Sequence, residues 1–115
     1  MPLNRPTQDE LLEAVAEYLS QPVVDTTADR FYRRVACNVV ELVRREQALQ
    51  SGFQNNERQH LKLLLADDED SVIELNRRLH QAIASGDLPL SPTLTEALLA
   101  IAKLKLDIDN PRYAL

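Results

Sequence analysis

The apolar residues of this 115-residue chain recur at helical spacing from one end to the other, and no stretch alternates as a strand would. Capping residues, prolines and glycines divide this pattern into five segments. Only two glycines and 4% aromatic residues are present, which disfavours a many-turned β-sandwich or a propeller. We therefore predict an all-α fold, a single-domain antiparallel bundle of about five helices over residues 1–115.

Local signals mark the ends of the predicted helices. Thr7 and Glu10 form a capping box at the start of the first helix, which Pro22 ends. The second helix runs from Asp25 or Thr26 to Ser51, and Gly52 is expected to terminate it. The third helix is expected to start near Asn55 or Asn56. The fourth starts at a capping box, Ser71–Glu74, and ends at Gly86. The fifth starts at Ser91–Pro92 and stops at Asn110–Pro111.

Charge and motif content exclude several classes of function. The net charge of -5 disfavours nucleic-acid binding, which draws its affinity from Lys and Arg contacts with phosphates. The single cysteine, Cys37, fits a reducing cytoplasm, and no apolar stretch approaches a membrane span. His60 and His80 lack partners at metal-ligand spacing, and neither a phosphate loop nor a nucleophile elbow occurs. We expect no metal, no cofactor and no catalytic residue.

Four polar residues interrupt the apolar stripes and form a predicted polar cluster. They are Asn38, Glu46, Asn76 and Lys105. One interpretation is a pocket between the second, fourth and fifth predicted helices that binds a small anion or acts as an enzyme, with Glu46 as acid or base and Lys105 as anchor. The alternative is structural: Lys105 extends to the surface, Glu46 forms an ion pair at the rim, and the asparagines satisfy backbone groups. The structural alternative is favoured, because structural ion pairs imitate active sites.

A second set of residues forms a predicted interaction face. It consists of Arg30, Arg33, Arg34, Arg44, Arg45, Arg112 and Tyr113. The first five lie away from the core stripe of the second helix, and the last two follow Pro111 at the end of the fifth. Arginine clusters recognise carboxylates and phosphates, although a solvated face paired with acidic loops is the simpler interpretation. An apolar flank at Tyr32, Val40 or Val43 would also suit a homodimer.

Three stretches resemble one family. They are Arg5–Leu19, Arg30–Glu46 and Lys103–Tyr113, and the closing N-P-R-Y is the most specific. The chain resembles an uncharacterised bacterial family of small helical proteins, classed as a domain of unknown function. Its genes often lie beside aminoglycoside-phosphotransferase-like kinases and acyl-CoA dehydrogenases. This resemblance implies a non-enzymatic accessory role with such a protein partner, and it transfers no catalytic residues.

Overall fold

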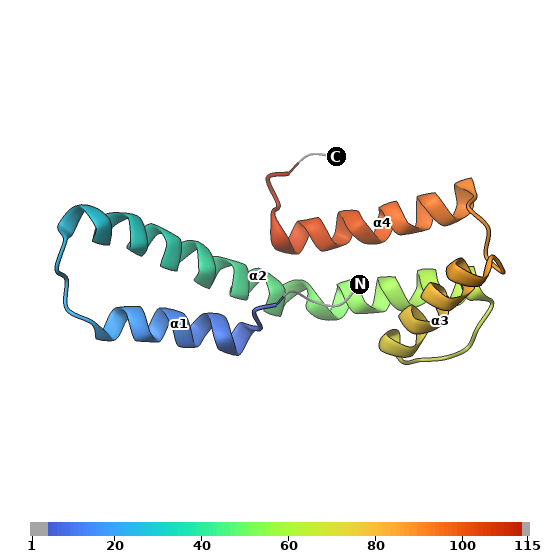
Figure 1. The fold of residues 1–115 in the computed structure, drawn as a ribbon, viewed down its shortest axis with the longest axis horizontal. Helices are drawn as coiled ribbons and strands as arrows, with labels where there is room; N and C mark the ends of the chain where they lie inside the picture. Colours follow the sequence, from blue (N-terminus) through green and yellow to red (C-terminus); the bar gives the residue numbers. More distant parts are fainter. Residues whose placement is uncertain (1–4, 114–115) are drawn as a thin grey trace. The chain divides into compact units, whose positions relative to one another are not determined.

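The computed structural model describes residues 5–113 as four α-helices joined by short connections (Figure 1). The helices are α1 (Gln8–Ser20), α2 (Thr26–Leu65), α3 (Val72–Ser85) and α4 (Pro92–Asp109). The described residues contain no strand, so the all-α prediction is confirmed. The predicted count of five is wrong by one.

The first capping box forms as predicted, and the second forms only in part. The Thr7 hydroxyl accepts a hydrogen bond from the Glu10 backbone N–H at 3.3 Å, and the Thr7 N–H donates to the Glu10 carboxylate at 3.2 Å. Ser71 likewise accepts from the Glu74 N–H at 3.2 Å. Its own N–H, however, donates to Glu69 at 3.0 Å. The Glu74 carboxylate is instead bound by two arginines of α3.

The other predicted ends are confirmed. Gly86 ends α3 in the left-handed region, with φ 83, where a side chain would be strained. Ser91 caps α4 by accepting from the Leu94 N–H at 3.2 Å, and Pro92 follows at the first helical position. Helix α4 stops at Asp109, immediately before the predicted stop.

Gly52 does not end a helix, because the predicted second and third helices are one 40-residue helix, α2. Phe53, Glu57 and Leu61 lie one turn apart, and all three are buried. Their common face continues through the predicted break. A glycine inside a helix costs only about 1 kcal/mol relative to alanine, which packing of this face outweighs.

We expect Gly52→Ala to raise the free energy of unfolding by about 0.5–1 kcal/mol, because alanine restricts the unfolded chain more than glycine does. A Cβ at this position meets nothing within 4 Å. Urea denaturation of both proteins measures the change. The matched control is Gly86→Ala, which should destabilise, since φ there is +83 although the space is equally open. A destabilised Gly52→Ala protein would contradict a continuous α2.

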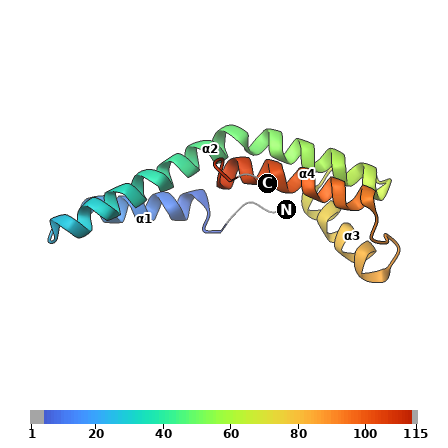
Figure 2. The same cartoon turned by 90° about the horizontal axis from the view of Figure 1, so that it is seen from above.

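The described residues divide into two compact units, residues 5–48 and residues 49–113. We call the first of these the hairpin unit; it contains α1 and the first part of α2. Its helices lie antiparallel and side by side (Figures 1 and 2). Helix α1 has no buried residue. The buried residues described in the hairpin unit, Val43 and Glu46, both lie on α2. A single domain over residues 1–115 stays a prediction.

The C-terminal unit, residues 49–113, contains the rest of α2 with α3 and α4 (Figure 1). It holds nearly all of the buried apolar side chains. These are Phe53, Leu61, Leu75, Leu79, Leu94, Ile101 and Ile108. Three helices thus enclose one apolar core. No helix in the described part of the chain has the length and apolar character that crossing a membrane requires.

Candidate functional site

A buried polar pair lies within the core of the C-terminal unit. The Glu57 side chain on α2 is 1% exposed. The Asn76 amide on α3 donates to the Glu57 carboxylate at 2.9 Å and to the Val72 carbonyl at 3.0 Å. A buried carboxylate requires such donors, because burial without them is costly. Asn76 therefore ties α3 to α2 through a hydrogen bond inside the core.

Glu57 is the residue that sequence reasoning missed. It lies four residues after Phe53 and four before Leu61, so the helical period indicates a buried position. That signal depends on one continuous helix. Because the prediction ends a helix at Gly52 and starts another near Asn55, Glu57 falls in an exposed first turn.

Lys105 is a buried cation on α4, at 8% exposure, between Ile101 and Ile108 on the same face. Its Nζ donates to the Asp109 carboxylate at 2.7 Å, one turn further along the helix. The Asp109 side chain is 27% exposed, so this ion pair lies at the margin of the core. The charge of Lys105 is therefore compensated by a carboxylate of its own helix.

The other two members of the predicted polar cluster lie in the hairpin unit. Glu46 is buried at 5% exposure, whereas Asn38 is exposed. The inward position predicted for Asn38 is therefore wrong, because α1 alone packs on this part of α2 within the hairpin unit. Asn76 does have a buried partner, but that partner is Glu57, which was not among the four residues of the predicted polar cluster. The four-residue pocket, and an ion pair between Glu46 and Lys105, stay predictions.

The acidic segment 67–70 is bound by basic side chains of the C-terminal unit. Arg78 contacts the carboxylates of Asp67 at 2.7 Å, Glu69 at 3.4 Å and Glu74 at 3.0 Å. The hydrogen bond from Arg78 lowers the pKa of Asp67, and the one from Lys62 lowers that of Asp70. Hydrogen bonds from Arg77 first, and then Arg78, lower the pKa of Glu74 to about 2. These charges hold the segment against α3.

We expect the ion pairs of Arg78 to stabilise the protein at neutral pH and to stop doing so in acid. Because the pKa values of Asp67 and Glu74 are lower in the folded state, their contribution is present above about pH 4.5 and is lost as the pH falls toward about 2. Arg78→Met should therefore lower Tm at neutral pH and leave it unchanged near pH 2. Thermal melts across this range measure the difference. A Tm difference that persists in acid would contradict this assignment, and Arg44→Met, at an exposed pair with Glu41, is the matched control.

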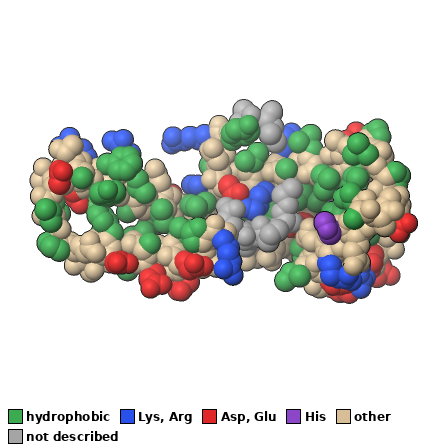
Figure 3. All heavy atoms as spheres, viewed as in Figure 1, with side chains coloured by type: hydrophobic (Ala, Val, Ile, Leu, Met, Phe, Trp, Pro, Cys, Tyr) green, Lys and Arg blue, Asp and Glu red, His purple; other side chains and the backbone are tan. Residues whose placement is uncertain are grey.

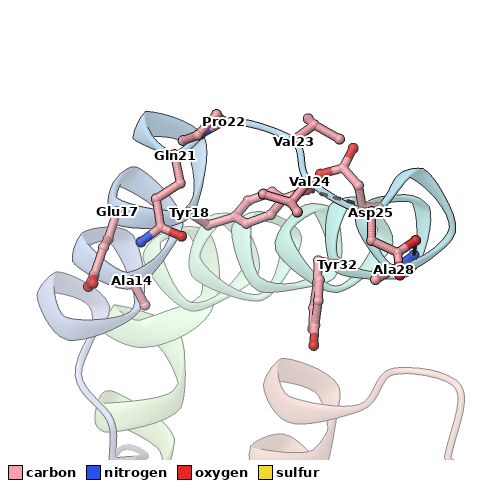
Figure 4. A pocket seen from close by; sticks show the side chains of 11 residues that line it. Ala14, Glu17, Tyr18, Gln21, Pro22, Val23, Val24, Asp25, Ala28 and Tyr32 are labelled. Atoms are coloured by element: carbon pink, nitrogen blue, oxygen red, sulfur yellow. Dashed lines mark hydrogen bonds between the residues drawn. The ribbon is translucent and has the colours of Figure 1, made fainter.

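An open pocket of about 490 Å³ lies at the turn between α1 and α2 (Figure 4). The ring of Tyr18 lies between Gln21 and Val24, and its hydroxyl donates to the Asp29 carboxylate. This hydrogen bond raises the pKa of Tyr18. The charged side chains that line the pocket are all carboxylates, namely Glu17, Asp25 and Asp29. Such a lining repels anions, so the pocket does not fit the predicted anion-binding role.

The predicted interaction face falls in two parts of the chain. On α2, Arg30, Arg33 and Arg34 are exposed. Arg44 is exposed and pairs with Glu41 at 3.0 Å, while Arg45 is half-buried. The closing Arg112 and Tyr113 are exposed as well, but they belong to the C-terminal unit. The first three turns of α2 therefore carry the part of this face in which exposed arginines lie three or four residues apart.

Metal and cysteine chemistry receive little support from the geometry. Between residues 5 and 113, no three His, Cys, Asp or Glu side chains are grouped so that they could hold a metal ion. Cys37 is exposed on α2, where the periodicity places it. A reactive thiol needs a neighbouring group that favours the thiolate, and exposure alone assigns Cys37 no role.

Comparison with known proteins identifies the family but no activity. A family model described as a domain of unknown function, DUF6285, matches residues 22–113. The match includes α2, α3 and α4, and it begins after α1. Neither a curated protein nor a solved structure matches the chain. The matched region covers most of the sequence, and the chain therefore belongs to the DUF6285 family.

Proposed function

We propose that this protein is a non-enzymatic accessory domain of the bacterial cytoplasm that acts by binding another protein. The observation that carries the proposal is the run of exposed arginines, Arg30, Arg33 and Arg34, on the first turns of α2 in a chain of net charge -5. Arginine is enriched where proteins bind one another, and a basic patch selects an acidic partner surface. The exposed Tyr113 adds a second favoured interface residue.

The partner class in this proposal is a small-molecule kinase-like enzyme or an acyl-CoA-metabolising enzyme. This choice follows from the resemblance of the sequence to a family encoded beside such enzymes. The buried charged groups of the C-terminal unit support a role without catalysis of its own. Glu57 receives a hydrogen bond inside the core, and Lys105 pairs with Asp109. In each case the contact compensates the burial of a polar side chain.

Binding measurements with charge-reversal variants test this proposal. We expect calorimetry to show that the purified chain binds a small-molecule kinase-like enzyme or an acyl-CoA dehydrogenase from the same organism. Arg33→Glu should weaken binding at least about tenfold, because it places an acidic group against an acidic surface. Tyr113→Ala should also weaken it. Neither variant should change the thermal melt, since both side chains are exposed.

Lys103→Glu is the matched control, because it makes the same change of charge at an exposed position of α4. It should leave binding within about twofold of the parent protein. Equal weakening by Lys103→Glu and Arg33→Glu would mean that net charge, and not the arginine patch, controls the association. Absence of binding to both enzyme classes would overturn the proposal.

A further inference from the structure

The hairpin unit exposes an apolar groove along the seam between its two helices. The groove encloses about 180 Å³ and has an almost entirely apolar lining. Its largest side chains are Leu11, Val15 and Tyr18 of α1 and Tyr32, Val35 and Val39 of α2. Tyr32 is 54% exposed and Val35 is 42% exposed, so the groove faces solvent. Apolar side chains cover much of this part of the molecule in Figure 3.

Phe31 extends the apolar surface beyond the groove. Its side chain is 59% exposed and lies one turn before Val35, and its ring packs edge-on against Tyr32 with centroids 5.7 Å apart. Val43, which the sequence groups with Tyr32 and Val40 as an apolar flank, is buried and takes no part in this surface. Exposed apolar patches on soluble proteins mark interaction sites. An open seam between two antiparallel helices is the form of groove that accepts the apolar face of a third helix.

The edge of the groove on α1 is acidic. Helix α1 contains four acidic residues and no Lys or Arg. Glu10 and Glu17 lie one turn before and one turn after Ala14, which lines the groove. Both carboxylates therefore border the seam on the same side, whereas Glu13 lies on the far side of the helix. A row of negative charge thus runs along α1 beside the apolar lining.

At the turn between α1 and α2, the groove continues into the pocket of about 490 Å³. The two cavities share three lining residues, Ala14, Tyr18 and Tyr32. The charged residues that line the pocket are Glu17, Asp25 and Asp29. Negative charge therefore follows the groove along α1 and gathers at its end beside the turn.

The edge of the groove on α2 is uncharged. The positions of α2 that border it are Phe31 and Asn38. Arg33 lies on the other side of the seam, where it lines a separate cavity with Leu19 and Val40. The groove thus combines an apolar floor, one acidic edge, one uncharged edge and an acidic end.

We propose that the occupant of this groove is a basic amphipathic helix of another protein. The lining spans two turns of each helix, about 12 Å, so it accepts about two turns of the incoming helix. Apolar side chains of that helix, three and four residues apart, pack between Tyr18 and Val35. Lys or Arg side chains along one flank meet Glu10 and Glu17, and a further cation at the end of the helix reaches the acidic pocket.

Charge complementarity selects this occupant over two others. An acidic helix would place like charges along the α1 edge, beside Glu10 and Glu17. A second copy of the same face would offer only an acidic edge and an uncharged one, so no turn of the hairpin onto itself pairs these carboxylates with a base. A basic flank satisfies the acidic edge, and the apolar face of the same helix suits the uncharged edge at Phe31.

Fluorescence anisotropy with two designed peptides tests the charge of the occupant. One is an amphipathic helical peptide of about 18 residues built from leucine and lysine, and the other has glutamate at each lysine position. We expect the full chain to bind the lysine peptide at micromolar concentration in about 0.15 M salt, and the glutamate peptide at least about tenfold more weakly. Both measurements use the parent protein, so they do not depend on the folding of any variant.

Two pairs of matched variants locate the binding site. Glu17→Lys should raise the Kd of the lysine peptide at least about tenfold, because it places like charges together at the groove. Glu13→Lys makes the same change on the far side of α1 and should stay within about twofold of the parent protein. Val35→Gln should weaken binding through loss of apolar contact, whereas Val40→Gln, at an exposed valine on the other side of the seam, should not. All four side chains are exposed, so the helical circular-dichroism signal should stay unchanged.

No binding of the lysine peptide, or equal binding of the two peptides, would overturn the proposal. Equal effects of Glu17→Lys and Glu13→Lys, or of Val35→Gln and Val40→Gln, would do the same. Sedimentation of the parent protein checks the remaining occupant: a dimer that dissociates with Val35→Gln but not with Val40→Gln would assign the groove to a second copy instead. This inference does not rest on the enzyme partner, which is tested with Arg33→Glu on the other side of the seam.

Discussion

Leu61→Ala is expected to lower the free energy of unfolding by about 3 kcal/mol, within the range of about 2–5 kcal/mol for a buried leucine. The Leu61 side chain is 0% exposed in the second part of α2. Truncation removes its apolar contacts and leaves a cavity that the surrounding helices fill only in part. Urea denaturation followed by circular dichroism measures the loss.

Leu63→Ala is the matched control for this experiment. It makes the same chemical change two residues later in the same helix, but the Leu63 side chain is 83% exposed. We expect its effect to stay within about 0.5 kcal/mol. Equal effects at the two positions would mean that α2 does not have one buried face within the C-terminal unit. The contrast therefore tests the buried face that this part of α2 contributes to the core of the C-terminal unit.

Asn76→Ala is expected to have the second large effect, a loss of about 2 kcal/mol or more. The variant removes a donor from the buried Glu57 carboxylate, and a buried charged group that loses a hydrogen bond carries a large desolvation cost. The pair joins α2 to α3, so the loss should appear as a lower urea midpoint with an unchanged slope.

A double-mutant cycle separates this hydrogen bond from simple loss of packing. Glu57→Met combined with Asn76→Leu replaces both partners with apolar side chains of similar size. We expect the double variant to lose less stability than the two single variants added together. Strict additivity would show that Asn76 does not contribute through Glu57, in conflict with the 2.9 Å contact.

Local sequence signals predict most helix ends correctly, for a physical reason. The bond from the Glu10 N–H to Thr7 and the one from the Leu94 N–H to Ser91 each join residues three apart. The left-handed φ of Gly86 is likewise a property of one residue. Such interactions form within a single turn, so they need no knowledge of the rest of the fold.

The two failures at α2 have a different origin. Gly52 resembles a helix end because glycine often follows one, but its φ is not left-handed. The helix continues because the face of Phe53 and Leu61 packs into a core formed with α3 and α4. Asn38 shows the opposite error. Its stripe is apolar, yet the part of α2 that carries it packs on α1 alone within its unit, and Asn38 stays exposed.

Sequence patterns alone predicted the all-α class, the ends of α1, α3 and α4, and the presence of polar residues on apolar stripes. Which of these stripes is covered depends on the packing of the helices. In the C-terminal unit, three helices enclose Glu57 and Leu61, whereas in the hairpin unit the same kind of stripe leaves Tyr32 and Val35 exposed. Periodicity reports which side chains share a face, but burial depends on how many elements pack against that face.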